Sequence, residues 1–105
     1  MPRSQHQKLK LYVLGKILME NTDENHGITM PEIIERLEKE EISADRKSIY
    51  DDIHALEDIG IYVEKQKIGK YFYYKVMEKQ FEVAELKLLV DAISASKFIT
   101  EKKSR

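Results

Sequence analysis

The sequence predicts an α+β fold in which three helices are followed by a β-hairpin and a further helix. Three observations carry this prediction. Apolar residues recur at helical spacing in three successive segments, and two runs of β-branched and aromatic residues then flank a turn glycine. A final segment dense in apolar residues closes the chain. With 105 residues, the chain has the length of one compact domain with a modest core.

The first predicted helix covers residues 5–21 and carries one apolar stripe. The stretch 21–27 that follows is polar and ends in a glycine, as loops commonly do. The apolar stripe of this helix consists of Leu11, Leu14, Ile17 and Leu18.

The second helix has a sharp predicted start. Thr29 and Glu32 have the spacing of a capping box, and Pro31 stands in the first turn, where its missing N–H costs nothing. The i, i+3, i+4, i+7 spacing of the apolar residues predicts a face that packs on a core. These residues are Met30, Ile33, Ile34 and Leu37.

The third helix follows after a short connection that holds one apolar residue, Ile42. Either Ser43 or Asp45 can cap its N-terminus, and Gly60 ends it. Two helices joined by so short a turn predict a helix-turn-helix. The buried stripe of the third helix is expected to consist of Ile49, Ile53 and Leu56.

Residues 61–66 and 71–76 are predicted strands, and residues 67–70 are the turn of the hairpin between them. For the aromatic run within the second strand we favour core and edge packing over stacking on unpaired bases. The last helix is predicted over residues 82–98. The aromatic run consists of Tyr71, Phe72, Tyr73 and Tyr74.

Composition excludes several classes of protein. Cysteine is absent, so disulfides and thiolate zinc sites cannot form, and a cytoplasmic location is expected. The sequence has neither an apolar run of membrane-spanning length nor an apolar signal core. His6, His26 and His54 have no paired metal-ligand spacing, and the four glycines are isolated, so neither a metal, a cofactor nor catalysis is expected.

The overall net charge of −1 hides an uneven distribution. Residues 1–20 carry a net charge of +3, whereas residues 21–45 carry −6. A nearly neutral chain can therefore present a basic face and an acidic face, and a charged partner responds to the local field. The total charge argues neither for nor against nucleic acid.

The outward side of the third helix is the candidate binding surface. At about 100° per residue, four polar side chains fall away from the buried stripe, where they can meet base edges or phosphates in a major groove. These four are Lys47, Tyr50, Asp51 and His54, flanked near the helix N-terminus by Arg46 and Ser48. The alternative is the ordinary polar face of any amphipathic helix.

The predicted hairpin adds cations beside this helix. Lys67 and Lys70 in the turn can reach flanking phosphates or a minor groove, and one further cation is expected from Arg3, Lys8 or Lys10. The alternative reading is a solvated turn, in which exposed lysines are common.

Two segments carry a family resemblance. Ile-Thr-Met-Pro-Glu-Ile-Ile at 28–34, followed by Asp-Arg-Lys-Ser-Ile-Tyr-Asp-Asp-Ile-His-Ala-Leu at 45–56, resembles the winged helix-turn-helix of WYL-domain (DeoR-like) bacterial transcriptional regulators. Residues 81–92 and 96–101 are similar to the segment after the wing in that family. The resemblance implies sequence-specific binding of double-stranded DNA through Arg46, Lys47, Ser48 and Tyr50. It also implies a structural role for Asp52.

The chain departs from the family in two respects. Asp51 stands where such regulators usually carry a cation, which should weaken phosphate contact or redirect the position toward a cytosine amino group. The WYL domain itself is missing, so we expect the DNA-binding part of a longer regulator, without an effector ligand. Residues 1–80 would form the DNA-binding domain, and residues 81–105 a helix for dimerisation or for linkage to the absent domain.

The last helix carries two apolar stripes, and a small domain needs only one of them for its own core. We therefore expect a homodimer, with the alternative that the spare stripe covers the missing domain. The larger stripe should face either a partner chain or the first helix, and it supplies the predicted dimer interface of Leu86, Leu89, Val90 and Ile93. The smaller stripe consists of Ala84, Leu88, Ala92, Ala95 and Ile99.

A rival function belongs to a different class, a winged-helix protein-interaction module that does not bind DNA. Its binding surface would be the acidic second helix facing a basic partner, although glutamate is also simply a good helix former. The acidic residues are Glu32, Glu35, Glu38, Glu40 and Glu41.

Overall fold

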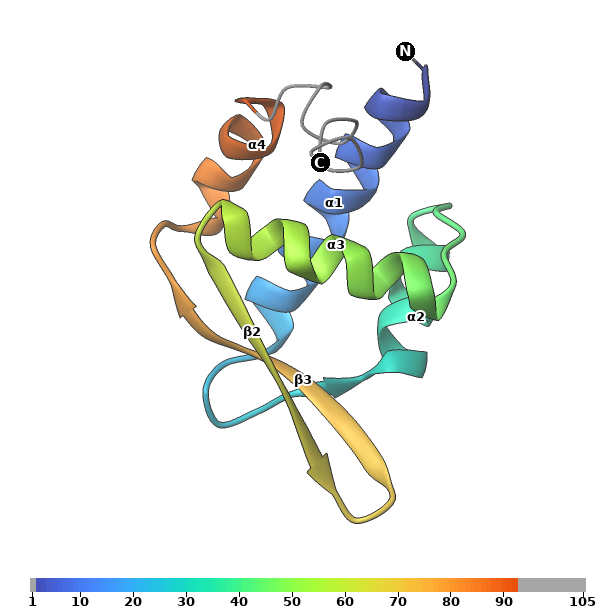
Figure 1. The fold of residues 1–105 in the computed structure, drawn as a ribbon, viewed down its shortest axis with the longest axis vertical. Coiled ribbons are helices and arrows are strands. Elements are labelled where there is room, and N and C mark those ends of the chain that lie inside the picture. The colour runs from blue at the N-terminus through green and yellow to red at the C-terminus, as the bar shows by residue number, and fades with distance from the viewer. Residues whose placement is uncertain (1, 93–105) are drawn as a thin grey trace, which may run out of the picture.

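The computed structural model describes residues 2–92 and the side chains of residues 7–92. Within that range the chain forms four helices and a three-stranded antiparallel sheet, which confirms the predicted α+β class (Figure 1). In chain order the elements are α1 (Pro2–Asn21), β1 (Ile28–Thr29), α2 (Met30–Lys39), α3 (Arg46–Asp58), β2 (Ile61–Ile68), β3 (Tyr71–Lys79) and α4 (Val83–Ala92).

Helix α1 lies at the centre of the core and packs against α2, α3, α4 and β3. Gly15, in the middle of α1, allows two of these helices to approach closely. A Cβ atom at Gly15 would lie only 3.1 Å from a methyl carbon of Leu86 on α4 and 3.2 Å from one of Leu56 on α3. The α1 stripe predicted from the sequence is buried and consists of Leu11, Leu14, Ile17 and Leu18.

Helix α2 begins and ends with local hydrogen-bonded motifs. The predicted capping box is present, because the Glu32 N–H donates to Thr29 Oγ1 and the Thr29 N–H donates to Glu32 Oε1. At the other end, the Ile42 N–H donates to the Leu37 carbonyl and the Glu41 N–H to the Glu38 carbonyl, the two bonds of a Schellman motif. Glu41 occupies the left-handed position there, with φ of 64°.

Helix α3 starts at the second of the two candidate caps. The Asp45 carboxylate accepts a 2.8 Å hydrogen bond from the Ser48 N–H, while Ser43 lies outside the helix. Gly60 follows the C-cap residue Ile59 with φ of 105°, as predicted for the end of this helix. The predicted stripe of Ile49, Ile53 and Leu56 is buried.

The hairpin is longer than predicted, since β2 reaches Ile68 and β3 reaches Lys79. Gly69 has φ of 66° and is the first central residue of a two-residue turn, the arrangement of type II′ hairpins. The turn is therefore Gly69–Lys70, and Lys67 belongs to a strand rather than to the tip. The end of the hairpin projects beyond the helices in Figure 1.

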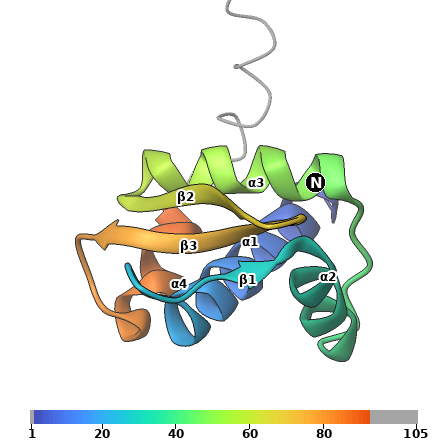
Figure 2. The same cartoon turned by 90° about the horizontal axis from the view of Figure 1, so that it is seen from below.

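Strand β1 was not expected from the sequence. Its two residues pair with β3 through Ile28↔Tyr74 and Thr29↔Tyr73, which gives the sheet order β1-β3-β2. Gly27 makes this pairing possible, because a Cβ atom there would lie 2.9 Å from the Tyr74 carbonyl oxygen. Figure 2 shows the three strands in this order, with α3 lying along the β2 side.

Helix α4 corrects the predicted dimer interface. Leu86 and Val90 are fully buried in the chain's own core against α1, so the larger stripe faces the first helix and these two residues are not a free surface. Leu89 is half-buried, and Ile93 lies outside the described residues, as does the rest of the predicted helix to residue 98. The exposed side of α4 carries the smaller stripe, with Leu88 72% exposed.

Among residues 2–92, no helix combines the length and the apolar character that crossing a membrane requires.

Candidate functional site

The outward side of α3 is exposed as the helical periodicity predicts. Lys47, Asp51 and His54 are all exposed, and Arg46 is exposed at the first position of the helix. Figure 2 shows α3 at one edge of the molecule, with the strands and the other helices on its opposite side. The sequence therefore predicted correctly which side of α3 meets solvent.

Tyr50 lies at the junction between α3 and the sheet instead of standing free. The Tyr74 hydroxyl donates a 3.0 Å hydrogen bond to the Tyr50 hydroxyl, and the two rings lie 6.2 Å apart at an angle of 48°. Burial raises the pKa of Tyr74, and the hydrogen bond to Tyr50 raises it further, while the positive charge of Arg46 opposes both. Arg46 stands four positions before Tyr50 on α3, which places the two side chains on the same side of the helix.

Ser48 is largely engaged in the first turn of α3. Its hydroxyl donates a 3.0 Å hydrogen bond to the Asp45 carbonyl, and its N–H donates to the Asp45 carboxylate. These bonds lower the pKa of Asp45, so the cap is a carboxylate at neutral pH. The Ser48 hydroxyl oxygen keeps only acceptor capacity, which does not suit contact with a phosphate oxygen.

The hairpin brings two lysines and an aromatic ring to one face. Lys65 pairs with Tyr74 and Lys67 with Phe72, and residues opposite each other in an antiparallel pair share a face. The Lys65 ammonium lies 5.4 Å from the centre of the Tyr50 ring and 4.7 Å from that of Phe72. The Lys67 ammonium lies 5.8 Å from the Phe72 ring. Lys70 is exposed in the turn.

Lys65 is a site residue that the sequence analysis missed, although strand alternation places it on the same face as Lys67. The packing interpretation of the aromatic run is right for the buried Tyr74. It is wrong for Tyr71 and Phe72, which are 59% and 43% exposed near the end of the hairpin.

Five cations of α3 and the hairpin have no carboxylate partner within the described part of the chain, whereas Lys75 on β3 donates to Gln66 and to the Glu24 carbonyl. In contrast, Lys79 and Lys87 lie within 4.0 Å of Glu82 and Asp91. The unpaired cations form a group that we call the α3–hairpin cation cluster. It consists of Arg46, Lys47, Lys65, Lys67 and Lys70.

One further DNA-binding cation was expected from Arg3, Lys8 or Lys10 in the first helix. The structure does not support this role for Lys8 or Lys10. The Lys10 ammonium is buried and lies 2.6 Å from the carboxylate of the buried Asp52 on α3. Lys8 donates a hydrogen bond to the Asp91 carbonyl on α4. The side chain of Arg3 lies outside the described residues. Asp52 is thus a buried residue that pairs α3 with α1.

The acidic helix lies apart from the cation cluster. Figure 2 shows α2 toward the opposite side of the molecule from the outer edge of α3. Glu32 is half-buried and engaged in the capping box, so it does not belong to a free acidic face. The exposed acidic residues are Glu35, Glu38, Glu40 and Glu41.

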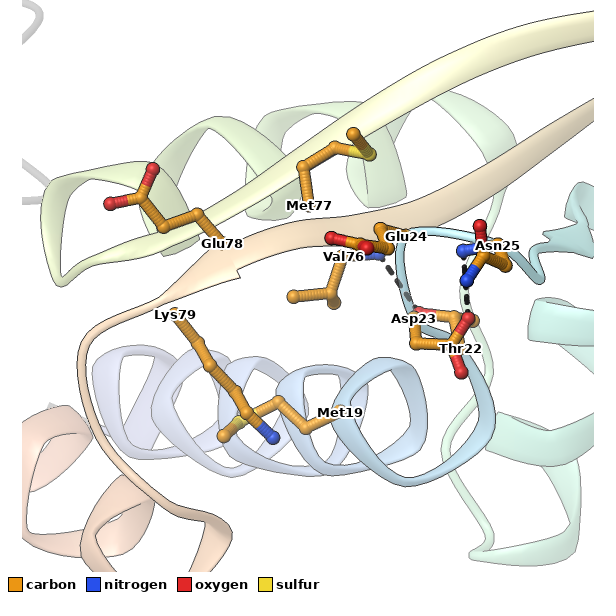
Figure 3. Close-up of a pocket in the computed structure, with 9 residues that line it drawn as sticks. All are labelled: Met19, Thr22, Asp23, Glu24, Asn25, Val76, Met77, Glu78 and Lys79. Atoms are coloured by element: carbon orange, nitrogen blue, oxygen red, sulfur yellow. Dashed lines mark hydrogen bonds between the residues drawn. The ribbon is translucent and has the colours of Figure 1, made fainter.

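A cleft of about 360 Å³ lies between the C-terminal end of α1 and the end of β3 (Figure 3). Two of its polar side chains are used in structural bonds. Thr22 Oγ1 accepts from the Val76 N–H and donates to the Leu18 carbonyl, and the Asp23 carboxylate accepts from the Asn25 N–H. Across residues 2–92 no group of three acidic or histidine side chains could hold a metal ion. Thr22 and Asp23 therefore contribute to the local fold at this cleft.

Comparisons of the chain with protein-family models, with curated proteins and with solved structures gave no match.

Proposed function

We propose that the chain is a winged helix-turn-helix that binds double-stranded DNA, as the DNA-binding part of a WYL-domain type bacterial transcriptional regulator. In this proposal α2 and α3 form the helix-turn-helix, α3 is the recognition helix and the β2–β3 hairpin is the wing. The observation that carries the proposal is the α3–hairpin cation cluster. Five cations that have no carboxylate partner among residues 7–92 lie on the exposed helix and on the hairpin beside it.

The dimensions of the site favour duplex DNA. An α-helix with its side chains is about 10–12 Å wide, and the major groove of B-DNA is about 12 Å wide. The end of the hairpin projects beyond the helices (Figure 1), so with α3 in the groove it would extend toward the neighbouring DNA backbone. Unpaired lysines on such a ribbon suit phosphate contacts, which fix the orientation of the protein on the duplex.

The residues of the site divide into two roles. Lys47, Asp51 and His54 lie on the exposed side of α3 and are proposed to meet base edges. Asp51 is only an acceptor when ionised, so it favours a cytosine amino group. The other cations of the cluster are proposed to bind phosphates, which supply affinity without sequence information.

Selection of bound sequences from random DNA tests the proposal. We expect enrichment of an inverted repeat. Lys47→Ala should cost about 1–3 kcal/mol on the selected site and relax its sequence preference. Lys67→Ala and Lys70→Ala should weaken binding to selected and random DNA alike. Lys39→Ala, an exposed lysine on α2, is the control and should bind as the unchanged chain does.

Two outcomes would contradict the proposal. Affinity for DNA that does not change with salt concentration would remove phosphate contacts as its source. Failure to enrich any sequence would favour the protein-interaction rival on the acidic α2 helix.

We also propose that the chain forms a homodimer through the exposed side of α4, in place of the larger stripe that the core buries. Leu88 and its exposed neighbours Ala84 and Ala92 form an apolar strip that the described core does not cover. Two-fold symmetry would present two α3 helices to half-sites about one helical turn apart. Light scattering should report a dimer at micromolar concentration, and Leu88→Glu should give a monomer. Met77→Glu, at an exposed apolar residue of β3, should leave the dimer intact.

A chain that is monomeric at every accessible concentration would contradict the dimer. The strip on α4 would then be left to a different partner.

A further inference from the structure

We propose that the Tyr50 hydroxyl, together with Arg46 and Lys65, forms a binding subsite for one DNA backbone phosphate where α3 meets the hairpin, and that Tyr74 orients this hydroxyl. The inference rests on the proposed DNA binding and names one contact within it. Tyr50 is the binding residue and Tyr74 is a positioning residue that does not touch the phosphate.

The direction of the tyrosine hydrogen bond follows from burial. Tyr74 is 3% exposed, and among the described residues its hydroxyl has Tyr50 as its hydrogen-bond partner. If Tyr50 donated the shared proton, the single proton of Tyr74 would remain buried without an acceptor, which costs about 1–3 kcal/mol. Tyr74 therefore donates. The proton of the Tyr50 hydroxyl is not used in this bond, and because Tyr50 as a residue is only half-buried, that proton can be donated outward.

Two cations flank this hydroxyl from different elements. The Lys65 ammonium on β2 lies 5.4 Å from the Tyr50 ring centre, and contact with the Phe72 ring at 4.7 Å restricts where it can move. Arg46 is the first residue of α3 and stands four positions before Tyr50, so the two side chains are neighbours on the same side of the helix. Neither cation has a carboxylate partner within residues 7–92, so both are available to an anion.

This arrangement suits a phosphodiester. Its two non-bridging oxygens carry one negative charge and accept several hydrogen bonds. One phenolic donor, one guanidinium and one ammonium supply both the charge and the donors that such a group needs. Because the subsite contains residues of α3 and β2, one bound phosphate would fix the helix and the hairpin together on the backbone.

The test compares four variants of the full chain by fluorescence anisotropy on one duplex. Tyr50→Phe removes the outward donor and keeps the ring, so we expect affinity to fall about 5–20-fold. Tyr74→Phe leaves the donor but not its orientation, and we expect a loss of about 2–5-fold. The double variant should bind no more weakly than Tyr50→Phe alone, because Tyr74 acts only through Tyr50. Tyr71→Phe, an exposed tyrosine near the end of the hairpin, is the matched control and should bind normally.

A second measurement distinguishes the subsite from a general effect on folding. Uncharged methylphosphonate groups are placed one at a time along the duplex backbone. The unchanged chain should lose affinity when the phosphate of the subsite is replaced. Tyr50→Phe should lose much less affinity at that same position, because it already lacks one contact to this phosphate. If thermal melting shows that Tyr74→Phe does not fold, this measurement with Tyr50→Phe still tests whether Tyr50 binds the phosphate.

The contradicting outcomes can be told apart. If the unchanged chain binds no duplex, the proposed function itself fails. If it binds DNA but Tyr50→Phe binds equally well, only the phosphate subsite is overturned. Additive losses in the double variant would overturn the positioning role of Tyr74.

Discussion

The buried ion pair between α1 and α3 makes one quantitative prediction. Lys10 and Asp52 keep only 10% and 12% of their side-chain surface exposed, and their charged atoms lie 2.6 Å apart. Their attraction at an effective dielectric constant of about 20 is about 6 kcal/mol, and the desolvation of each ion costs several kcal/mol. Consistent with that balance, burial raises the pKa of Asp52 even though Lys10 opposes the shift. The pair as a whole therefore adds little net stability.

Removing only the lysine should still be costly. Lys10→Met leaves the buried Asp52 carboxylate without its cation. The carboxylate can then become neutral only by taking up a proton. From an ordinary pKa of 3.8 this uptake costs about 4 kcal/mol at pH 7 and about 2 kcal/mol at pH 5. We expect the free energy of unfolding to fall by about 3–4 kcal/mol at pH 7 and by at most about 2 kcal/mol at pH 5.

The sign of the pH dependence follows from the raised pKa. The folded chain holds the Asp52 proton more tightly than the unfolded chain does. The contribution of this group to stability is therefore greatest below pH 3.8 and is lost as the pH rises through the folded-state pKa. Lys10→Met removes the charge that opposes the rise, so the folded-state pKa of Asp52 should rise further. The loss of stability should then continue to higher pH.

Urea unfolding followed by circular dichroism at pH 5 and pH 7 measures both effects. Lys16→Met, at an exposed lysine of the same helix, is the control and should change stability by less than about 0.5 kcal/mol. Replacing both partners, as Lys10→Met with Asp52→Leu, should restore stability to within about 1 kcal/mol or exceed it. An equal cost of Lys10→Met at the two pH values would refute the reasoning.

Three further predictions concern other parts of the molecule. Glu41→Gly should raise the free energy of unfolding by about 0.5–1 kcal/mol in urea titrations, because glycine relieves the left-handed backbone at the end of α2; unchanged or lower stability would contradict this. Val90→Glu should cost more than about 3 kcal/mol in the same assay, because it buries a carboxylate against α1; a normally stable variant would contradict that packing. If all five cations of the α3–hairpin cation cluster meet phosphates, the logarithm of DNA affinity should fall with the logarithm of salt with a slope of about −4.5, and Lys67→Ala should reduce the slope by about 0.9; an unchanged slope would exclude a phosphate contact for Lys67.

The two ends of the helices could be predicted because the signals that set them are local. The Thr29–Glu32 capping box involves residues three positions apart, and the structure contains both of its hydrogen bonds. Asp45 and Gly60 likewise act on backbone groups within one turn of α3. Such motifs depend little on the rest of the fold.

The sheet was harder to predict because its pairing involves residues far apart in the chain. Strand β1 has two residues, too few for a periodic pattern, and it depends on the close approach of Gly27 to Tyr74. The hairpin was predicted too short because the turn was placed at residues 67–70. The left-handed Gly69 closes it in two residues instead.

The candidate site was predicted in part. Helical periodicity correctly gave the exposure of Lys47, Asp51 and His54. It could not show that Tyr50 bonds to Tyr74, because these residues lie 24 positions apart. Similarly, two apolar stripes on α4 left the choice of core face open, and the close packing of Leu86 at Gly15 shows which stripe is inside.

The alternation of the hairpin limits how its length can change. Lys65 and Lys67 share a face because they are two residues apart, whereas Glu64 and Gln66 lie on the other face. One extra residue between Val63 and Glu64 that kept the strand regular would turn both lysines away from Tyr50 and bring glutamate and glutamine in their place. A two-residue extension of each strand would only lengthen the hairpin. We therefore expect functional variants of this hairpin to differ in length by even steps, with each added pair of positions moving the turn about 7 Å farther along the same face.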